Sequence, residues 1–493
     1  MGTLVACTLM AGAMMATELR IRVEDEGGRP VWARLEVRGP DGKMHQPAGA
    51  VLDTVKNARG GGAFYLGSFV IRDGAVMEVP PGRYTVIAER GLEYERVERA
   101  VDAPGSVELR PRPWIRMNDR GWWSADLHVH RRLEDASALA QAEDLNLMVL
   151  TTMWNQRNLW AGKPWPSDPV VRVSPRHLVT LLNAEDERGG GAWMLNALRE
   201  ALPLAVPGRW YPPGLVFIRQ ARAQRPPGGV LPWFDCEKPI WWEVPVVMAL
   251  AAPDSFGVLH NHFMQYGIHA NEAWGRPRDQ AKFPGAEGFV EYTTGLYYRY
   301  LNLGFRLAPS AGSASGVLPN PVGYSRVYAQ LDGPLSVEKF YTAMREGKSF
   351  VSNGPMLFFT ATTEGRVRVE ARAHEPIDRV EIVANGTVLK RWTPPASAKT
   401  FKGSFTFDAR KHSWVAARCF LKPGATIRLA HSSPGYLPGK FDARADARYF
   451  VEWIDELIAQ TAADRARFTS DAERDEVLAL YRQARAVYEA KTR

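Results

Sequence analysis

The chain of 493 residues is poor in cysteine and histidine. It has three cysteines, Cys7, Cys236 and Cys419, and no two of them have the close spacing of a zinc-binding motif. Cys236 and Cys419, the two beyond the N-terminal segment, allow one disulfide bond at most. A metal site in this chain must therefore use histidine and carboxylate ligands.

Long apolar runs, blocks of basic residues, internal repeats and low-complexity tracts are also missing. Beyond the N-terminus, no apolar run is long enough to span a bilayer, so we expect no stable membrane insertion. The net charge is +8, but lysine and arginine are spread thinly and form no nucleic-acid-binding motif. We therefore expect no nucleic-acid partner, although the basic average favours attraction of an anionic substrate.

The N-terminal segment from Leu4 to Ala16 is apolar and rich in small residues. Ala11-Gly12-Ala13 matches the A-x-A cleavage site of a signal peptide, and Leu4-Val5-Ala6-Cys7 has some similarity to a lipoprotein signal. A basic n-region is missing, which a misplaced start codon would explain; the alternative is a segment without a targeting role. We predict a signal peptide over residues 1–16 and a periplasmic or secreted protein.

The length exceeds what one hydrophobic core holds, so several domains are expected. Residues 18–112 show strand-like alternation and frequent turns, which predicts a β-sandwich, and Pro81 to Val86 resembles the regulatory-like sandwich found beside carboxypeptidases. Residues 113–355 alternate apolar stretches with helical segments. That alternation predicts an α/β domain with a largely parallel sheet or barrel.

The last third of the chain is expected to contain a second β-domain and a helical tail. Alternating residues return over 356–436, while 437–493 has helical periodicity, with Phe450, Ile454 and Leu457 on one face. Ser470 and Glu473 form a capping box at the start of the last helix.

Five of the ten histidines fall into two groups: His128 and His130, then His260, His262 and His269. Residues two apart on a strand share a face, so Asp126, His128 and His130 are expected to point together. His260-Asn261-His262 follows an apolar stretch and is expected to repeat this geometry. Two such strand ends can bring His128, His130 and His260 to one metal ion, whereas a single pair would as readily be structural.

Carboxylates are expected to complete the site. Asp126 shares the predicted ligand face and could bind metal or orient an imidazole. Glu185-Asp186-Glu187, which precedes Gly189-Gly190-Gly191, is the best source of a carboxylate ligand or general base, although a solvated acidic turn explains it equally well on its own.

The central segment resembles a PHP domain of the CehA/McbA, or carbaryl-hydrolase-like, type. The resemblance covers nearly the whole chain, and its motifs are Trp122 to His130, Pro309 to Ser313, Asn320 to Tyr324, Ser352-Asn353-Gly354-Pro355 and Ala430 to Pro434. It implies a distorted (β/α)₇ barrel with metals at the carboxyl ends of the strands. It further implies hydrolysis of phosphoesters or, in this branch, of ester-like and carbamate-like bonds.

The chain departs from this family at three ligand positions. Thr152-Met153-Trp154 replaces a Thr-Asp-His phrase, Ala192-Trp193-Met194 replaces a glycine-histidine pair, and Ser313-Ala314-Ser315-Gly316 replaces an Asp-x-His pair. The family ligands that remain by position are His128, His130, Glu185 and His260. We therefore predict one divalent transition metal, preferably zinc, with manganese, iron and nickel as alternatives.

One metal with an open position suffices to activate water for hydrolysis. Glu187, His262 and Glu243 are equal candidates for the catalytic proton shuttle. Aromatic residues near these motifs could stack a small molecule or a carbohydrate, although core packing explains any single one; they are Trp154, Trp193, Trp241, Trp242, Trp274, Tyr297 and Tyr298. Two alternatives to a hydrolase stay open: a catalytically silent protein that binds carbohydrate, and a metal-dependent lyase.

Overall fold

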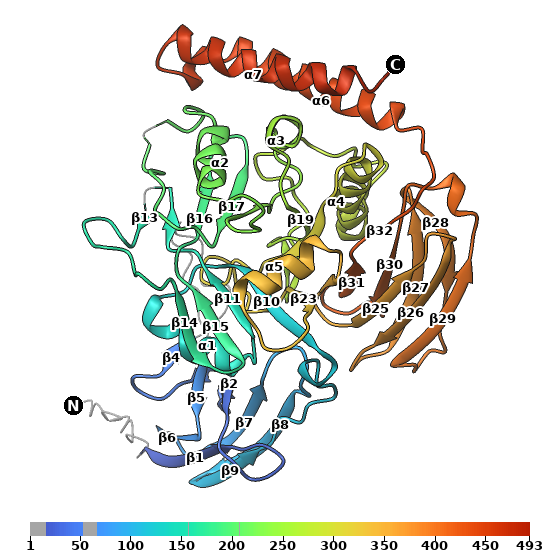
Figure 1. Ribbon diagram of the computed structural model, residues 1–493. Coiled ribbons are helices and arrows are strands. Elements are labelled where there is room, and N and C mark those ends of the chain that lie inside the picture. The colour runs from blue at the N-terminus through green and yellow to red at the C-terminus, as the bar shows by residue number, and fades with distance from the viewer. Residues whose placement is uncertain (1–15, 53–66, 156, 207) are drawn as a thin grey trace, which may run out of the picture.

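The computed structural model describes residues 16–52, 67–155, 157–206 and 208–493. Residues 1–15 of the predicted signal peptide, Cys7 included, lie outside this part of the chain. The described chain is a multidomain α/β and β protein with large mixed sheets and seven α-helices. In Figure 1 the N-terminal strands lie at the bottom, the mixed α/β region above them, the C-terminal strands at the right and two long helices at the top.

The N-terminal region contains two β-sheets around one hydrophobic core. In the smaller sheet, β1 (Thr17–Val23) pairs with β6 (Gly74–Val79) and β9 (Gly105–Leu109). The larger sheet contains β2 (Trp32–Arg38), β3 (Met44–His45), β4 (Val51–Leu52), β5 (Ser68–Arg72), β7 (Gly82–Glu89) and β8 (Val97–Ala103). Leu19 and Ile21 of the first sheet share their core with Leu35 and Val37 of the second, as expected for strands that alternate between a buried and an exposed face.

The central region is built on two further sheets and five helices. The first sheet contains β10 (Trp122–Val129), β11 (Leu147–Leu150), β14 (Val170–Ser174), β15 (His177–Thr180), β23 (Arg326–Gln330) and β24 (Ser349–Ser352). The second contains β12 (Met153–Trp154), β13 (Arg157–Asn158), β16 (Ala184–Glu187), β17 (Ala192–Asn196), β18 (Trp233–Cys236), β19 (Ser255–Leu259) and β22 (Ala308–Ala311). The helices are α1 (Leu133–Ala142), α2 (Gly214–Ala223), α3 (Val244–Ala251), α4 (Gly285–Asn302) and α5 (Val337–Arg345), and β20 (Phe263–Met264) pairs with β21 (Gly267–Ile268).

The two central sheets meet at β10. The His130 backbone N–H donates to the Ser315 carbonyl at 2.7 Å, and the Ala314 N–H donates to the His128 carbonyl at 2.8 Å. The end of β10 is therefore held against the segment that follows β22. Residues of both sheets, such as Leu127 and Val258, belong to one hydrophobic core.

The C-terminal strands continue the first central sheet. β31 (Leu429–Ser432) pairs with β24, and β30 (Trp414–Leu421), β27 (Ile377–Ala384) and β28 (Thr387–Trp392) follow it in order, with β32 (Gly435–Tyr436) beside β30. A separate sheet contains β25 (Met356–Ala361), β26 (Arg366–Arg372) and β29 (Thr400–Thr406). A continuous sheet thus crosses the domain boundary that the sequence suggested near residue 355. Cys236 and Cys419 are both buried free thiols.

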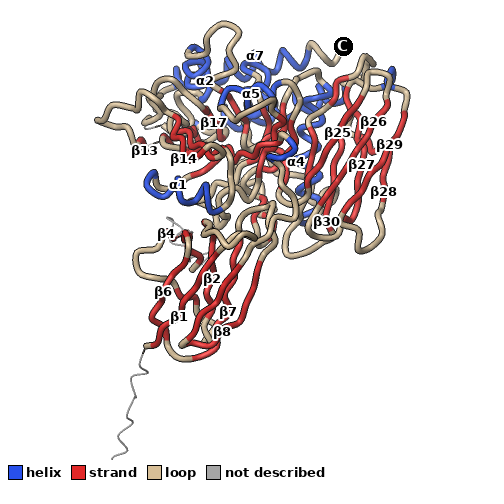
Figure 2. The backbone as a smooth tube through the Cα atoms, turned by 60° about the horizontal axis from the view of Figure 1, so that its bottom comes forward, coloured by secondary structure: helices blue, strands red, loops and turns tan. Residues whose placement is uncertain are grey.

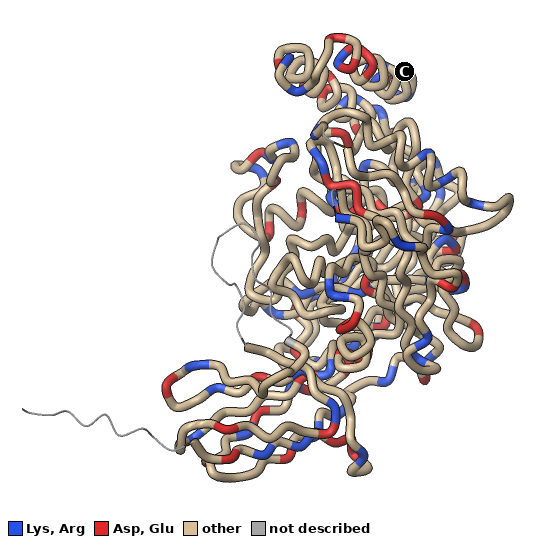
Figure 3. The backbone as a smooth tube through the Cα atoms, turned by 90° about the vertical axis from the view of Figure 1, so that its left-hand side faces the viewer, with Lys and Arg blue, Asp and Glu red and all other residues tan. Residues whose placement is uncertain are grey.

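The chain ends in α6 (Arg444–Ala463) and α7 (Asp471–Glu489), which both contact α3. Figure 2 shows α7 at the same end of the molecule as α2. Ser470 caps α7 as predicted, because its side chain accepts a hydrogen bond from the Glu473 N–H. The Glu473 carboxylate accepts in return from the Thr469 N–H, one residue before the position that a capping box uses. The Tyr488 hydroxyl donates to the Pro245 carbonyl at 2.9 Å, which ties α7 to α3. Among the described residues, no helix is both long and apolar enough to cross a membrane. Basic and acidic residues are interspersed along the backbone in the view of Figure 3.

Candidate metal centre

Two strands bring the first candidate ligands together. His128 lies near the carboxyl end of β10, His130 follows directly, and Glu185 lies in β16 of the other central sheet. The Nε2 atoms of His128 and His130 are 2.8 Å apart, and Glu185 Oε2 lies 3.2 Å from the first and 3.0 Å from the second. These separations are below twice the bond length of about 2.1 Å that zinc makes with nitrogen or oxygen. One ion can therefore contact all three residues, which form the only such group among the described residues.

Burial and charge shape the protonation of this group. Burial alone would lower the pKa of His128, but the carboxylates of Glu185 and Glu237 outweigh it and raise that pKa to about 10. Burial likewise opposes ionisation of Glu185, yet the neighbouring histidines hold its pKa well below the usual range. Burial is the largest cause of the lowered pKa of His130. A proton on His128 thus supplies the positive charge beside the Glu185 carboxylate that a bound metal ion would otherwise supply.

Several buried polar atoms of these residues, of Glu237 and of His260 have no hydrogen-bond partner among the described residues; they include Glu185 Oε1, His128 Nδ1, Glu237 Oε2 and His260 Nε2. Leaving such atoms without partners costs free energy, so groups like these usually coordinate or hydrogen-bond something. Histidine nitrogen and carboxylate oxygen are the donor types that divalent transition metals prefer. The residues present therefore fit a metal ion.

Glu237 and Lys238, which follow β18, are part of this site and were missed by the sequence reasoning. Glu237 Oε1 lies 3.5 Å from His128 Nδ1 and accepts a hydrogen bond from the Asn261 N–H at 2.8 Å. Lys238 Nζ lies 3.2 Å from Glu187 Oε1 and 3.3 Å from Glu237 Oε2. The available signal was a charged pair directly after the buried strand Trp233–Cys236.

The second histidine pair does not repeat the geometry of the first. His260, Asn261 and His262 form a turn after β19, closed by a hydrogen bond from the Phe263 N–H to the His260 carbonyl at 3.0 Å. His260 lies outside the group of three close ligands. Burial lowers its pKa to about 4, so the imidazole is in its neutral, metal-binding form at neutral pH.

His262 lines a cavity and is held in one tautomer. Its Nδ1 donates to the His269 carbonyl at 3.0 Å, and its ring stacks on Phe289. In a neutral imidazole this leaves Nε2 as the acceptor. Burial lowers the pKa of His262 well below its ordinary value, which favours that neutral form.

Asp126 does not join the histidines. Its carboxylate accepts hydrogen bonds from the backbone N–H groups of His128, Ser313 and Gly323 and from the Ser313 hydroxyl. The pairing of β10 with β11 is irregular between Asp126 and Val129. The regular alternation of side chains along a strand therefore does not predict which way Asp126 points relative to the histidines. Its role is to tie β10 to the loop after β22.

The remaining acidic candidates lie in different surroundings. Glu187 lines the same cavity as the histidines. Asp186 forms an ion pair with Arg188. Glu243 is buried at the start of α3, where its carboxylate accepts a hydrogen bond from the Tyr481 hydroxyl of α7. It does not line the cavity.

The cavity above the group has a volume of about 440 Å³. Trp154, Trp241 and Trp274 line it together with Met264 and Leu318. The Trp154 ring lies 4.7 Å from the His130 ring, measured between centroids. The other aromatic candidates, Trp193, Trp242, Tyr297 and Tyr298, do not line it.

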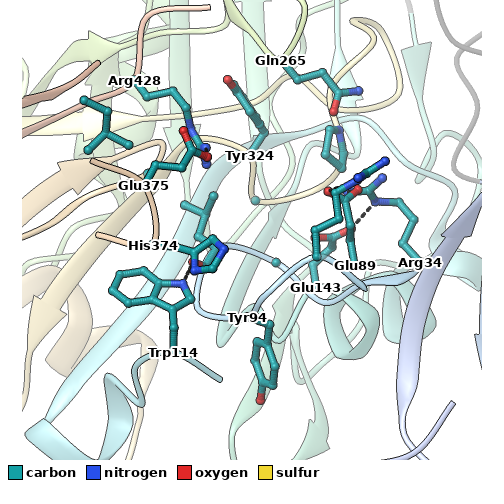
Figure 4. Close-up of a pocket in the computed structure, with 17 residues that line it drawn as sticks. Arg34, Glu89, Tyr94, Trp114, Glu143, Gln265, Tyr324, His374, Glu375 and Arg428 are labelled. Atoms are coloured by element: carbon teal, nitrogen blue, oxygen red, sulfur yellow. Dashed lines mark hydrogen bonds and ion pairs between the residues drawn. The ribbon is translucent and has the colours of Figure 1, made fainter. Parts of the chain in front are cut away.

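A second hollow of about 290 Å³, shown in Figure 4, lies where the N-terminal, central and C-terminal regions meet. Its charged residues pair with one another: Arg34 with Glu89 and Glu143, and Arg428 with Glu375. Of these pairs, Arg34–Glu143 joins the N-terminal region to the central region.

No protein-family model matches the chain, and no curated protein shows a significant similarity to it.

Proposed function

We propose that this protein is a metal-dependent hydrolase of the PHP, CehA/McbA-like type. It would act on an ester, carbamate or glycan-type bond of a small molecule or carbohydrate. The observation that carries the proposal is the convergence of His128, His130 and Glu185 within 4.8 Å of one another beside a cavity lined by tryptophan. Enclosed cavities with a few convergent polar groups are the usual form of a small-molecule site.

The proposal includes a distorted (β/α)₇ barrel. The parallel pairs β10–β11–β15 and β18–β19–β22 support it, as do the backbone hydrogen bonds that join the end of β10 to the segment after β22. In a barrel, the carboxyl ends of the strands gather the functional residues at one face.

His128, His130 and Glu185 would hold one divalent ion. His260 would be the fourth ligand, because its buried Nε2 has no hydrogen-bond partner among the described residues. Such an ion, preferably zinc, lowers the pKa of water and polarises a carbonyl oxygen. His262 is the best-placed proton acceptor, since its Nε2 carries the lone pair and its ring lines the cavity. Glu187 is less suited to this role because its carboxylate is paired with Lys238.

A catalytically silent protein that binds a carbohydrate or aryl ligand is the second candidate. The tryptophans of the cavity favour it, because Trp241 and Trp274 contact each other with ring centroids 5.4 Å apart and present an aromatic wall. The two functions differ in their need for metal and in turnover.

The deciding experiment combines metal analysis with assays on a panel of aryl acetates, aryl N-methylcarbamates and aryl glycosides. A hydrolase is expected to carry metal, to turn over one class, and to lose that activity on chelation. The His130→Ala variant is the matched control and should lose both metal and turnover. Ligand binding by metal-free protein without any turnover would favour the binding protein instead.

A further inference from the structure

The ammonium group of Lys238 is buried among three carboxylates. Its Nζ atom lies 3.2 Å from Glu187 Oε1, 3.3 Å from Glu237 Oε2 and 3.9 Å from Glu185 Oε1. The lysine is 5% exposed, and its ammonium also lies 5.3 Å from the centre of the Trp241 ring. A lysine is rarely buried so deeply unless its charge is fully balanced.

Glu185 connects this lysine to the candidate metal ligands. One carboxylate oxygen, Oε2, contacts Nε2 of both His128 and His130. The other oxygen, Oε1, has no hydrogen-bond partner among the described residues and has Lys238 as its nearest recorded cation. Each oxygen of the Glu185 carboxylate therefore faces a different cation site. A carboxylate that bridges two metal ions binds one ion through each oxygen in the same way.

The charges of the cluster balance with one metal ion. Glu185, Glu187 and Glu237 bring three negative charges, while Lys238 and one divalent ion bring three positive charges. A second divalent ion in the same pocket would add uncompensated charge and would repel the fixed ammonium at short range.

We propose that Lys238 takes the place of a second metal ion, so that its ammonium group limits the site to a single divalent ion. This inference rests on the proposed function, because it assumes that a metal binds at His128, His130 and Glu185. It assigns to Lys238 a positioning role: the lysine fixes the orientation of Glu185 and Glu187 that a second ion would otherwise fix.

The test replaces Lys238 by methionine, which keeps an unbranched stem as long as that of lysine up to Cε and removes the charged ammonium group. Lys238→Arg, which keeps the charge, is the matched control. Each purified protein is titrated with Mn²⁺, and bound metal is measured by calorimetry, by elemental analysis and by electron paramagnetic resonance. Circular dichroism checks that each variant is folded.

The wild type and Lys238→Arg should bind one Mn²⁺ ion, with the spectrum of an isolated ion. Lys238→Met should bind a second ion with the spectrum of a coupled pair, and should hold the first at least about tenfold more tightly, because a like charge has been removed nearby. One ion in Lys238→Met, with the affinity of the wild type, would overturn the inference and leave the proposed function intact.

Two outcomes do not depend on the variant folding. Wild-type protein that binds two tightly held Mn²⁺ ions in a coupled pair would overturn the role of Lys238 but not the hydrolase. Wild-type protein that binds no metal under saturating Mn²⁺ or Zn²⁺ would overturn the proposed function, and the inference with it.

Discussion

The Nε2 atoms of His128 and His130, two residues apart at the end of one strand, lie 2.8 Å from each other. Two imidazole nitrogens this close share either a proton or a cation. The carboxylate oxygen of Glu185 lies 3.0–3.2 Å from both nitrogens. Its negative charge favours a cation at this position over two neutral rings facing each other.

Metal binding should stabilise the folded protein. Because the three ligands are brought together only by folding, Zn²⁺ binds the native state preferentially, and at a concentration of 100 times Kd the gain is about 2.7 kcal/mol. Thermal unfolding should therefore shift upward on addition of Zn²⁺ and back on addition of EDTA. The His130→Ala variant should show little of this shift. An equal shift in that variant would mean that Zn²⁺ binds at a site other than His128, His130 and Glu185.

His262→Gln should separate proton transfer from metal binding. The variant loses the imidazole acceptor at the cavity wall, and loss of a general base typically lowers turnover about 10²–10⁴-fold. The metal content should stay at the wild-type value, because His262 is outside the group of close ligands. The measurement is kcat as a function of pH, on an aryl substrate that the wild type turns over. An unchanged kcat in His262→Gln would show that His262 is not the proton acceptor.

Glu243 should affect stability and not metal binding. Its buried carboxylate accepts a hydrogen bond from the Tyr481 hydroxyl and joins α3 to α7. In Tyr481→Phe this bond is lost and the carboxylate stays buried, which should cost about 1–3 kcal/mol of unfolding free energy. Denaturant unfolding measures the cost, while metal content and KM should not change. A loss of metal in Tyr481→Phe would contradict this separation.

Glu93 should make the stability depend on pH. Burial raises the pKa of this carboxyl to about 7 from 4.5, and its carboxylate accepts a hydrogen bond from the Met117 N–H. Because the folded state holds the proton more tightly, the stabilising contribution is complete below pH 4.5 and is lost as the pH rises through 7. The loss amounts to a few kcal/mol, at about 1.4 kcal/mol per pH unit.

The control for this effect is Glu93→Gln, which has no charge at any pH and keeps a carbonyl acceptor. The unfolding midpoint of the wild type should fall relative to that of Glu93→Gln between about pH 5 and pH 8. A constant difference over this range would show that Glu93 does not titrate there.

The sequence predicted those features that depend on local periodicity. The alternation of Leu19, Ile21 and Val23 indicated a strand with one buried face, and the structure buries all three. Ser470 and Glu473 marked the start of α7. His128 and His130 were placed together because residues two apart on a strand share a face.

The sequence could not predict features that depend on partners distant in the chain. Asp126 has the same spacing as the histidines, yet its carboxylate is used by Ser313 and Gly323. Glu243 was one of three equal candidates for the proton shuttle, but folding places its carboxylate against the Tyr481 hydroxyl of α7. Lys238 became part of the site only when folding brought the end of β18 to the carboxylates of β16, with β17 between the two strands, which no spacing in the sequence reveals.

The most direct test of the account is the metal content of protein purified from a medium supplemented with zinc, measured by elemental analysis against protein concentration. We predict about one equivalent of metal in the wild type and none in His128→Ala, because His128 contacts both the second histidine and Glu185. Two or more equivalents in the wild type, or none, or an unchanged content in His128→Ala would contradict the account.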